Sequence, residues 1–310
     1  MKTKRKNGVG LNFFTEDQCA KIVESAISVL EKTGCRVKNA RAKEILGSAG
    51  CKVEGDIVKI PSSLMHDAIA SVPKEVSLYD REGNLAVTLS AHSDSRYIAP
   101  GISSPHRVDL ETGKSRPSVR ADIVQAAVLE DNLENIDVAC SMTSISDCDE
   151  SVKDVVETAL MIENTHKPFM INSFSPKSVE AEVEMLAAVR GSEEALREKP
   201  YVLGSQTAVS PLGHTEESLD TFMSLVEHGI PTVYLGAPSM GATGPITIAG
   251  CYVATLADCF LGLLLSQLIY RGYPFVACAF VDVMDMRTMM FSFSAPEFAL
   301  NSMASAEIFR

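Results

Sequence analysis

The segment from Tyr201 to Phe280 constrains the fold most, because short apolar runs alternate in it with helical segments. The runs are rich in Val, Tyr or Phe and read YVLGSQT, PTVYLGA and PFVACAF. Short apolar runs joined by helical crossovers indicate buried parallel strands. Nearly every run ends in a polar, Gly-rich loop, which is where a parallel α/β fold carries its chemistry.

The same alternation begins near residue 94. The runs RYIAPG, IDVACSM and PFMINSF read as strands, and residues 119–131, 151–164 and 176–190 have helical periodicity. This makes about six β/α units, whereas a closed barrel has eight strands. We therefore predict a TIM (β/α)8 barrel with about six strands present and its last units lying past Arg310. A doubly wound open sheet is the alternative; it needs no further strands, but the chain has no GxGxxG phosphate loop.

Residues 1–93 do not follow this alternation and predict an N-terminal α+β extension before a barrel region of 94–310. Thr15 and Gln18 form a capping box that starts the first helix. The run CKVEGDIVKI predicts a β-hairpin, and VSLYD and LAVTL predict two further strands.

Composition excludes several function classes. The net charge of -12 argues against nucleic acid as the main partner, and we interpret the basic cluster Lys2–Lys6 as a solvated tail. Eight Cys without a CxxC pair, and no apolar segment after the basic start, favour a reduced cytoplasmic protein. The apolar segment Ile246–Tyr270 contains Asp258, so we expect a buried helix with a hydrogen-bonded structural carboxylate and no membrane role.

In a barrel the site lies at the carboxyl ends of the strands. These positions are poor in His and Cys, which argues against a metal site. Asp285 and Glu297 are the best-placed acids and our candidate catalytic residues; solvent exposure for Asp285 and helix capping after Pro296 for Glu297 are the alternatives. Arg287 could pair with a substrate carboxylate or form a surface ion pair.

Further candidates for substrate binding fall on or near the predicted strands. Aromatic side chains there could bind a cationic ammonium group, although such residues are more often core. The candidates are Tyr97, His106, Asn172, Phe174, Gln206, Tyr234, Phe280 and Phe291.

Taken together, these segments resemble the trimethylamine methyltransferase family, which includes betaine-type enzymes without pyrrolysine. The resemblance rests on LNFFTEDQ, ISVLEKTGCRV, AGCKVEGDIVKIP, VDLETGKSR, NLENIDV, AVSPLG, MGATGPITIAG, LADCFLGLLLSQL, GYPFVACAF and SAPEF. It implies a TIM barrel with an N-terminal extension. It also implies methyl transfer from a methylated amine to the Co(I) of a separate, cognate corrinoid protein, with no cofactor bound directly. The DxHxxG motif of the corrinoid carrier is absent from the sequence.

Among the substrates of such a family, we favour a betaine-like quaternary amine. A quaternary nitrogen is already cationic and leaves as a neutral amine, so its site needs mainly placement. The close alternative is a pyrrolysine-dependent trimethylamine enzyme, because the position that divides the family lies past residue 310. A quaternary-ammonium-binding protein without catalysis and an unrelated TIM-barrel enzyme also stay open. We expect a homo-oligomer.

Overall fold

The central element is a parallel sheet whose strands follow one another in chain order. The computed structural model describes residues 13–90, 93 and 95–309, so the basic cluster Lys2–Lys6 lies outside the described residues. The sheet has the order β13-β11-β9-β8, and all neighbours in it are parallel. Its strands are β8 (Phe169–Ile171), β9 (Val202–Thr207), β11 (Thr232–Gly236) and β13 (Phe275–Ala279). The expected α/β class is confirmed.

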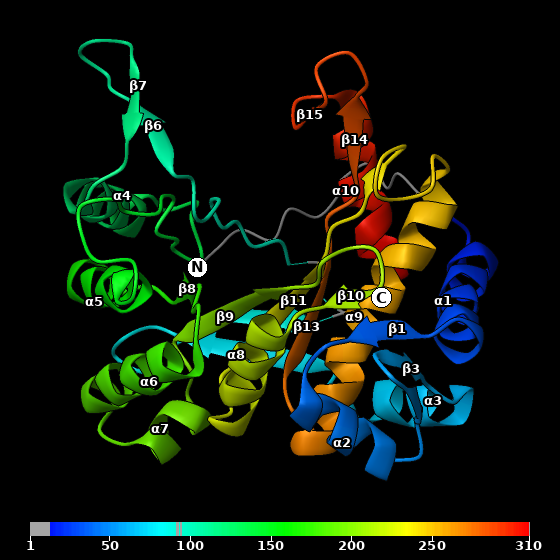
Figure 1. The fold of residues 1–310 in the computed structure, drawn as a ribbon. Helices are drawn as coiled ribbons and strands as arrows, with labels where there is room; N and C mark the ends of the chain where they lie inside the picture. The colour runs from blue at the N-terminus through cyan, green and yellow to red at the C-terminus, as the bar shows by residue number, and fades with distance from the viewer. Residues whose placement is uncertain (1–12, 91–92, 94, 310) are drawn as a thin grey trace.

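Helices cover one face of this sheet. Phe169 and Val202 pack against α6 and α8, and Tyr234 and Phe275 pack in a core with α8 and α9. In Figure 1, α8 lies in front of the strands. The helices of this region are α4 (Arg120–Asn132), α5 (Lys153–Asn164), α6 (Pro176–Arg190), α7 (Glu193–Glu198), α8 (Glu216–Glu227) and α9 (Ile248–Ile269).

A β-hairpin from the N-terminal extension covers the opposite face. Leu78 and Val87 of this hairpin form a buried cluster with Val138 and Leu203, and Met170 packs against it. The hairpin consists of β4 (Glu75–Tyr79) and β5 (Leu85–Ser90), which lie behind the parallel sheet in Figure 1. A doubly wound sheet carries helices on both faces, so this arrangement does not match that alternative. The described residues form no closed barrel; the sheet is open.

The remaining extension elements form as their local signals predict. Helix α1 begins after Thr15 with the capping box to Gln18, and β2 and β3 form the expected antiparallel hairpin. The extension shares the core of α9 and completes its own sheet with β10 (Gly213–His214), which pairs with β1 in parallel. Its elements are α1 (Glu16–Lys32), β1 (Cys35–Val37), α2 (Ala40–Ser48), β2 (Lys52–Glu54), β3 (Ile57–Lys59) and α3 (Ser62–Ser71).

Two predicted strands, RYIAPG and IDVACSM, form no regular strand. They still run beside the sheet: the Ile98 carbonyl accepts from the Asp137 amide at 2.8 Å, and Ala139 forms a parallel bridge with Phe169. A second parallel bridge joins Ser104 and Thr143. The order of the sheet therefore continues past β8 through irregular segments.

Two hairpins that the apolar pattern of the sequence did not predict project from the carboxyl side of the sheet. The first, β6–β7, forms directly after Ser104, and β14 pairs antiparallel with β15 shortly after β13 ends. Both stand at the top of Figure 1. The elements are β6 (His106–Val108), β7 (Ser115–Pro117), β12 (Ser239–Met240), β14 (Asp282–Asp285), β15 (Met290–Phe291) and the final helix α10 (Pro296–Ile308).

Helix α9 is long and apolar enough to cross a membrane, but 72% of its most apolar window is buried inside the protein. Asp258, at the centre of α9, is fully buried. Its carboxylate accepts from the Ser210 hydroxyl at 2.5 Å and from the Leu212 amide at 2.6 Å. The predicted structural role of Asp258 is confirmed, since it holds the loop that follows β9.

Candidate functional site

The two faces of the sheet differ in what they expose. We call the side covered by β4–β5 the inner face; it carries Met170, Leu203, Val233 and Val276. Because side chains alternate along a strand, Asn172, Ser205 and Thr207 lie on the same face, nearer the carboxyl ends. We call these three residues the polar strip. They are partly or fully exposed, whereas the strand residues facing the helices are mostly buried.

The polar strip is tied to the segment that precedes β6. The Asn172 amide donates to the Ser103 hydroxyl at 2.9 Å. The neighbouring Ser104 accepts at its carbonyl from the Thr143 hydroxyl at 2.7 Å, and its own hydroxyl donates to the His106 carbonyl at 2.8 Å. Of the predicted site residues, Asn172 and His106 are thus brought to the same edge, joined through Ser103 and Ser104.

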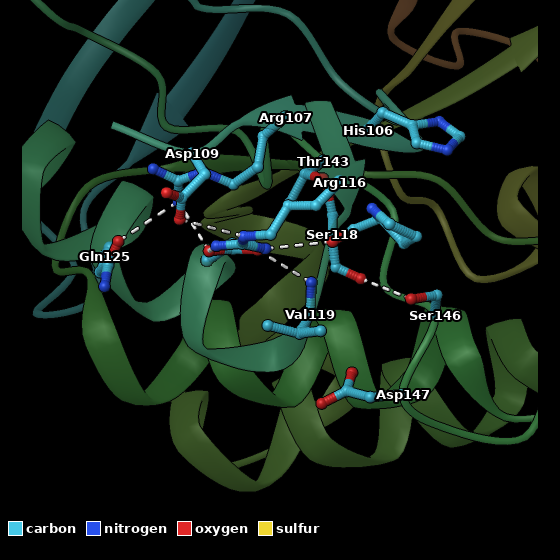
Figure 2. Close-up of polar contacts among 12 residues, drawn as sticks. His106, Arg107, Asp109, Arg116, Ser118, Val119, Gln125, Thr143, Ser146 and Asp147 are labelled. Atoms are coloured by element: carbon cyan, nitrogen blue, oxygen red, sulfur yellow. Dashed lines mark hydrogen bonds and ion pairs between the residues drawn. The ribbon is translucent and has the colours of Figure 1, made fainter. Parts of the chain in front are cut away.

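An ion-pair cluster fixes the hairpin that carries His106. Asp122, 3% exposed in the first turn of α4, accepts from Arg107 at 2.7 Å, from Arg116 at 2.7 and 2.9 Å, and from the Val119 amide at 2.9 Å. The hydrogen bonds from Arg116 hold the pKa of this carboxyl well below its usual range. Figure 2 shows His106 pointing away from the arginines, so its ring is free of this cluster.

Aromatic rings follow both edge strands of the sheet. Phe174 follows β8, is 47% exposed, and has the Lys153 ammonium 5.4 Å from its ring centroid. Phe280 follows β13, and its ring lies 5.8 Å from Phe293 and 5.2 Å from Phe298. Phe291 joins the same cluster through Phe293, at 6.1 Å. The structure therefore brings Phe174, Phe280 and Phe291 to the carboxyl side of the sheet.

Three predicted substrate-binding residues lie elsewhere. Tyr234 is fully buried on the helix side, with its hydroxyl 2.9 Å from His214 Nδ1 and its ring 4.8 Å from Phe222. Gln206 also turns to the helix side, where its amide donates to the Ser173 carbonyl at 2.9 Å. Tyr97 packs in the cluster under β4–β5, toward the amino ends of the strands. None of the three borders the polar strip.

The predicted charged residues lie on β14–β15 and α10. The Asp285 carboxylate accepts from the Arg287 amide at 2.9 Å, a bond that lowers the pKa of Asp285 and closes the turn of the hairpin. Both side chains are exposed. Glu297 is exposed in the first turn of α10, which begins at Pro296, and it makes no capping hydrogen bond there. No group of three or more His, Cys, Asp or Glu in the described part of the chain could hold a metal ion.

Sequence reasoning missed a set of buried carboxylates behind the polar strip. Asp154, Glu157 and Glu182 are 3%, 6% and 0% exposed. Burial raises the pKa of Glu182 to about 7 and also raises the pKa of Glu157. The sequence did carry a signal that Glu182 is buried. Glu182 lies at helical spacing from the apolar residues Val179 and Leu186, on the buried stripe of α6.

The fold and the site define an α/β protein that gathers uncharged polar and aromatic side chains at the carboxyl ends of parallel strands. Open α/β sheets bind small molecules at these ends. Comparison with known proteins gives the family. The model of the trimethylamine methyltransferase (MTTB) family matches residues 2–310. The chain therefore belongs to this family.

Curated relatives match nearly the whole chain. The glycine betaine methyltransferase of Desulfitobacterium hafniense (strain Y51) is 28% identical over 96% of the chain, and the proline betaine:corrinoid methyltransferase of Eubacterium limosum is 28% identical over 93%. The trimethylamine methyltransferase MttB of Methanosarcina barkeri is 28% identical over 97%. The chain spans 62%, 60% and 62% of the lengths of these three relatives.

Proposed function

We propose that the protein transfers a methyl group from a betaine-like quaternary amine to the Co(I) of a cognate corrinoid protein. The observation that carries the proposal is family membership along residues 2–310, with relatives named for glycine betaine and for proline betaine with corrinoid. The expected (β/α)8 barrel belongs to the same proposal. It is supported by the chain-order parallel sheet with helices on one face.

The chemistry makes modest demands on the protein. The methyl carbon–nitrogen bond breaks and its electron pair stays on nitrogen, which leaves as a neutral tertiary amine. The acceptor Co(I) supplies the electron pair of the new carbon–cobalt bond and becomes methyl-Co(III). No proton has to move, so the protein has to hold the cation in line with the acceptor and keep that side open.

The inner face suits this task. Asn172, Ser205 and Thr207 are uncharged, and they leave the ammonium group free of a strong ion pair that would hold the substrate in its ground state. Phe174 and Phe280 offer aromatic faces, which attract quaternary ammonium groups. We assign substrate contact to Asn172, Phe174 and Phe280. His106 and Phe291 are assigned to the rim where the corrinoid protein approaches.

Asp285 and Glu297 take a narrower role in this proposal than direct catalysis. Both are exposed acids on the elements that follow β13. A quaternary amine needs no general acid, so we propose that their negative charge attracts the trimethylammonium end of the zwitterionic betaine and orients it toward the inner face. Arg287, beside Asp285, is the proposed partner for the carboxylate of a betaine.

The test mixes the purified full-length protein with Co(I) cobalamin and, in separate samples, glycine betaine, proline betaine or trimethylamine. Formation of methyl-Co(III), followed by its absorption spectrum, is expected with a betaine. Methylation with trimethylamine alone would favour the trimethylamine alternative. Calorimetric binding of a betaine without methylation would identify a binding protein, and neither binding nor methylation with any amine would refute the proposal.

A further inference from the structure

The segment that joins β8 to α6 is held from behind by two buried carboxylates. The Glu182 carboxylate, from the middle of α6, accepts from the Ser173 hydroxyl and, at 2.8 Å, from the Thr158 hydroxyl. Asp154, from the first turn of α5, accepts from the Phe174 amide at 2.8 Å. Ser173 and its peptide link to Phe174 are thereby fixed to two different helices.

We call the hydrogen bonds that join Glu182 and Asp154 to residues 173 and 174 the anchor. The anchor affects the neighbouring side chains because successive side chains point in opposite directions. Ser173 turns its side chain toward the helices and its neighbour Asn172 is directed to the inner face, while Phe174 follows with its ring 5.4 Å from the Lys153 ammonium. Holding Ser173 by side chain and the next residue by its amide sets the direction in which both neighbours emerge. A slip of this segment would turn Asn172 away from the inner face and change the direction in which Phe174 emerges.

The free-energy cost of burying these carboxylates indicates that they do more than fill space in the core. Burying a carboxylate costs several kcal/mol unless a cation or several hydrogen bonds compensate. Among the described residues, neither Glu182 nor Asp154 forms an ion pair with Lys, Arg or His. An apolar side chain on α6 would fill the same space at lower cost. The carboxylates accept hydrogen bonds from residues 173 and 174, which an apolar side chain could not do.

The carboxylates do not form a binding site of their own. The cavity beside Asp154 is lined by Asp154, Glu157 and Asn172, among others, and has a volume of about 10 Å³. Such a volume holds one water molecule at most. Any effect of Glu182 or Asp154 on a ligand must therefore pass through the segment that they hold.

We propose that Glu182 and Asp154 are positioning residues that orient Asn172 and Phe174 for the methylated amine, an inference that rests on the proposed function. Glu182 acts through the Ser173 hydroxyl, and Asp154 acts through the Phe174 amide. Ser173 is the third member of this arrangement, because its hydroxyl is the group that Glu182 holds.

The experiment compares Ser173→Ala, Glu182→Leu and Glu182→Gln in the full-length protein, with Glu180→Gln as the control. Glu180 lies on the same helix and is exposed. Ser173→Ala and Glu182→Leu are expected to raise the KM for glycine betaine about tenfold, which corresponds to about 1.4 kcal/mol, and to change kcat much less. Glu182→Gln keeps an acceptor and a donor for the two hydroxyls, so it should restore most of the affinity. Glu180→Gln should match the wild type.

Hydrogen exchange of residues 169–176 provides a readout that needs no substrate. Exchange at the Phe174 amide should accelerate in Ser173→Ala and Glu182→Leu while the melting temperature of Ser173→Ala stays within a few degrees of wild type. Faster exchange with an unchanged KM would overturn the positioning role and leave the proposed function intact. Wild-type protein that neither binds nor demethylates any amine would refute the function itself. If Glu182→Leu does not fold, the KM of Ser173→Ala decides alone.

Discussion

Asp122 and Arg116 are joined by two hydrogen bonds, of 2.7 and 2.9 Å, that connect the first turn of α4 to the second strand of the β6–β7 hairpin. Arg107, from the first strand, donates to the same carboxylate at 2.7 Å. One buried acid therefore holds both strands of this hairpin. The other contacts are fewer: Arg107 also donates to Gln125 at 3.2 Å (Figure 2), and the Ser104 hydroxyl donates to the His106 carbonyl. An isolated two-stranded hairpin is marginal in water, so the position of His106 depends on Asp122.

The first prediction follows from this anchor. Asp122→Asn removes the charge and one of the two hydrogen bonds in the bidentate contact with Arg116, so we expect the free energy of unfolding to fall by about 1.5–3 kcal/mol. Hydrogen exchange should rise most in residues 105–118. Urea unfolding and exchange mass spectrometry measure the two effects. Glu134→Gln, an exposed acid just past the end of α4, is the control, and equal stability of the two variants would contradict the anchor.

The second prediction concerns pH. Burial raises the pKa of Glu182 from about 4.5 to about 7 and that of Asp258 from 3.8 to about 6. The folded state therefore binds more protons than the unfolded state between about pH 4 and pH 7, and the free energy of unfolding falls as the pH rises through this window. For Glu182 alone the loss is on the order of 3 kcal/mol.

Urea unfolding at pH 5 and pH 8 measures this dependence. Glu182→Gln cannot ionise, so the difference in unfolding free energy between the two pH values should shrink relative to wild type. Glu184→Gln, an exposed acid on the same helix, should leave the difference unchanged. A wild-type protein that is more stable at pH 8 than at pH 5 would show that other groups dominate.

The third prediction tests the packing of α9 on the sheet. A Cβ atom at Gly262 would lie 2.8–2.9 Å from ring atoms of Tyr234, which is fully buried. Gly262→Ala should therefore lower the free energy of unfolding by about 1–3 kcal/mol, despite the better helix propensity of Ala. Gly47→Ala is the matched control: Gly47 also lies in a helix, and its Cβ would meet Val53 at an ordinary 3.5 Å. That variant should gain up to about 1 kcal/mol.

The sequence predicted elements well where a local signal was sufficient. The capping box of Thr15 and Gln18 set the start of α1, and the helical periodicity over residues 176–190 matched α6. The acid in an apolar helix, Asp258, could be assigned a structural role because a buried charge needs partners. Each of these inferences depends on neighbours within one element.

The orientation of strand residues could not be predicted in the same way. Parallel strands that are buried on both faces read as continuous apolar runs, without the alternation that distinguishes the faces. Gln206 and Tyr234 therefore looked like neighbours of the site, whereas both side chains turn to the helix side. The hairpins β6–β7 and β14–β15 were missed because they are exposed and polar or Met-rich, so no apolar pattern marks them.

The fourth prediction separates attraction of the substrate from catalysis. If Asp285 and Glu297 act by their charge, Asp285→Asn and Glu297→Gln should each lower the methylation rate about two- to threefold at low betaine concentration and low salt. The effect should fade at high salt, because exposed charges are screened. The rate at saturating betaine and the melting temperature should stay unchanged. Rates equal to wild type in both variants at low salt would remove the two acids from the site.

The last prediction concerns the aromatic rim. Phe280 stands at the carboxyl end of β13, and its amide donates to the Gly236 carbonyl at 3.0 Å, which fixes the backbone that carries the ring. Phe280→Leu keeps apolar area but removes the ring quadrupole, so the Kd for glycine betaine should rise about three- to tenfold, an effect of about 1 kcal/mol.

Phe14→Leu is the matched control for this variant. Phe14 is also half-buried and its ring lies 6.1 Å from that of Tyr252, but it belongs to the N-terminal extension. Calorimetric titration with glycine betaine, and with the carboxylate analogue in which an uncharged tert-butyl group replaces trimethylammonium, distinguishes the two contributions. Because a cation–π contact discriminates charge, Phe280→Leu should weaken binding of the betaine much more than binding of the tert-butyl analogue. Equal weakening of both ligands would mean that Phe280 contributes only shape, and the cation-binding role would then pass to Phe174.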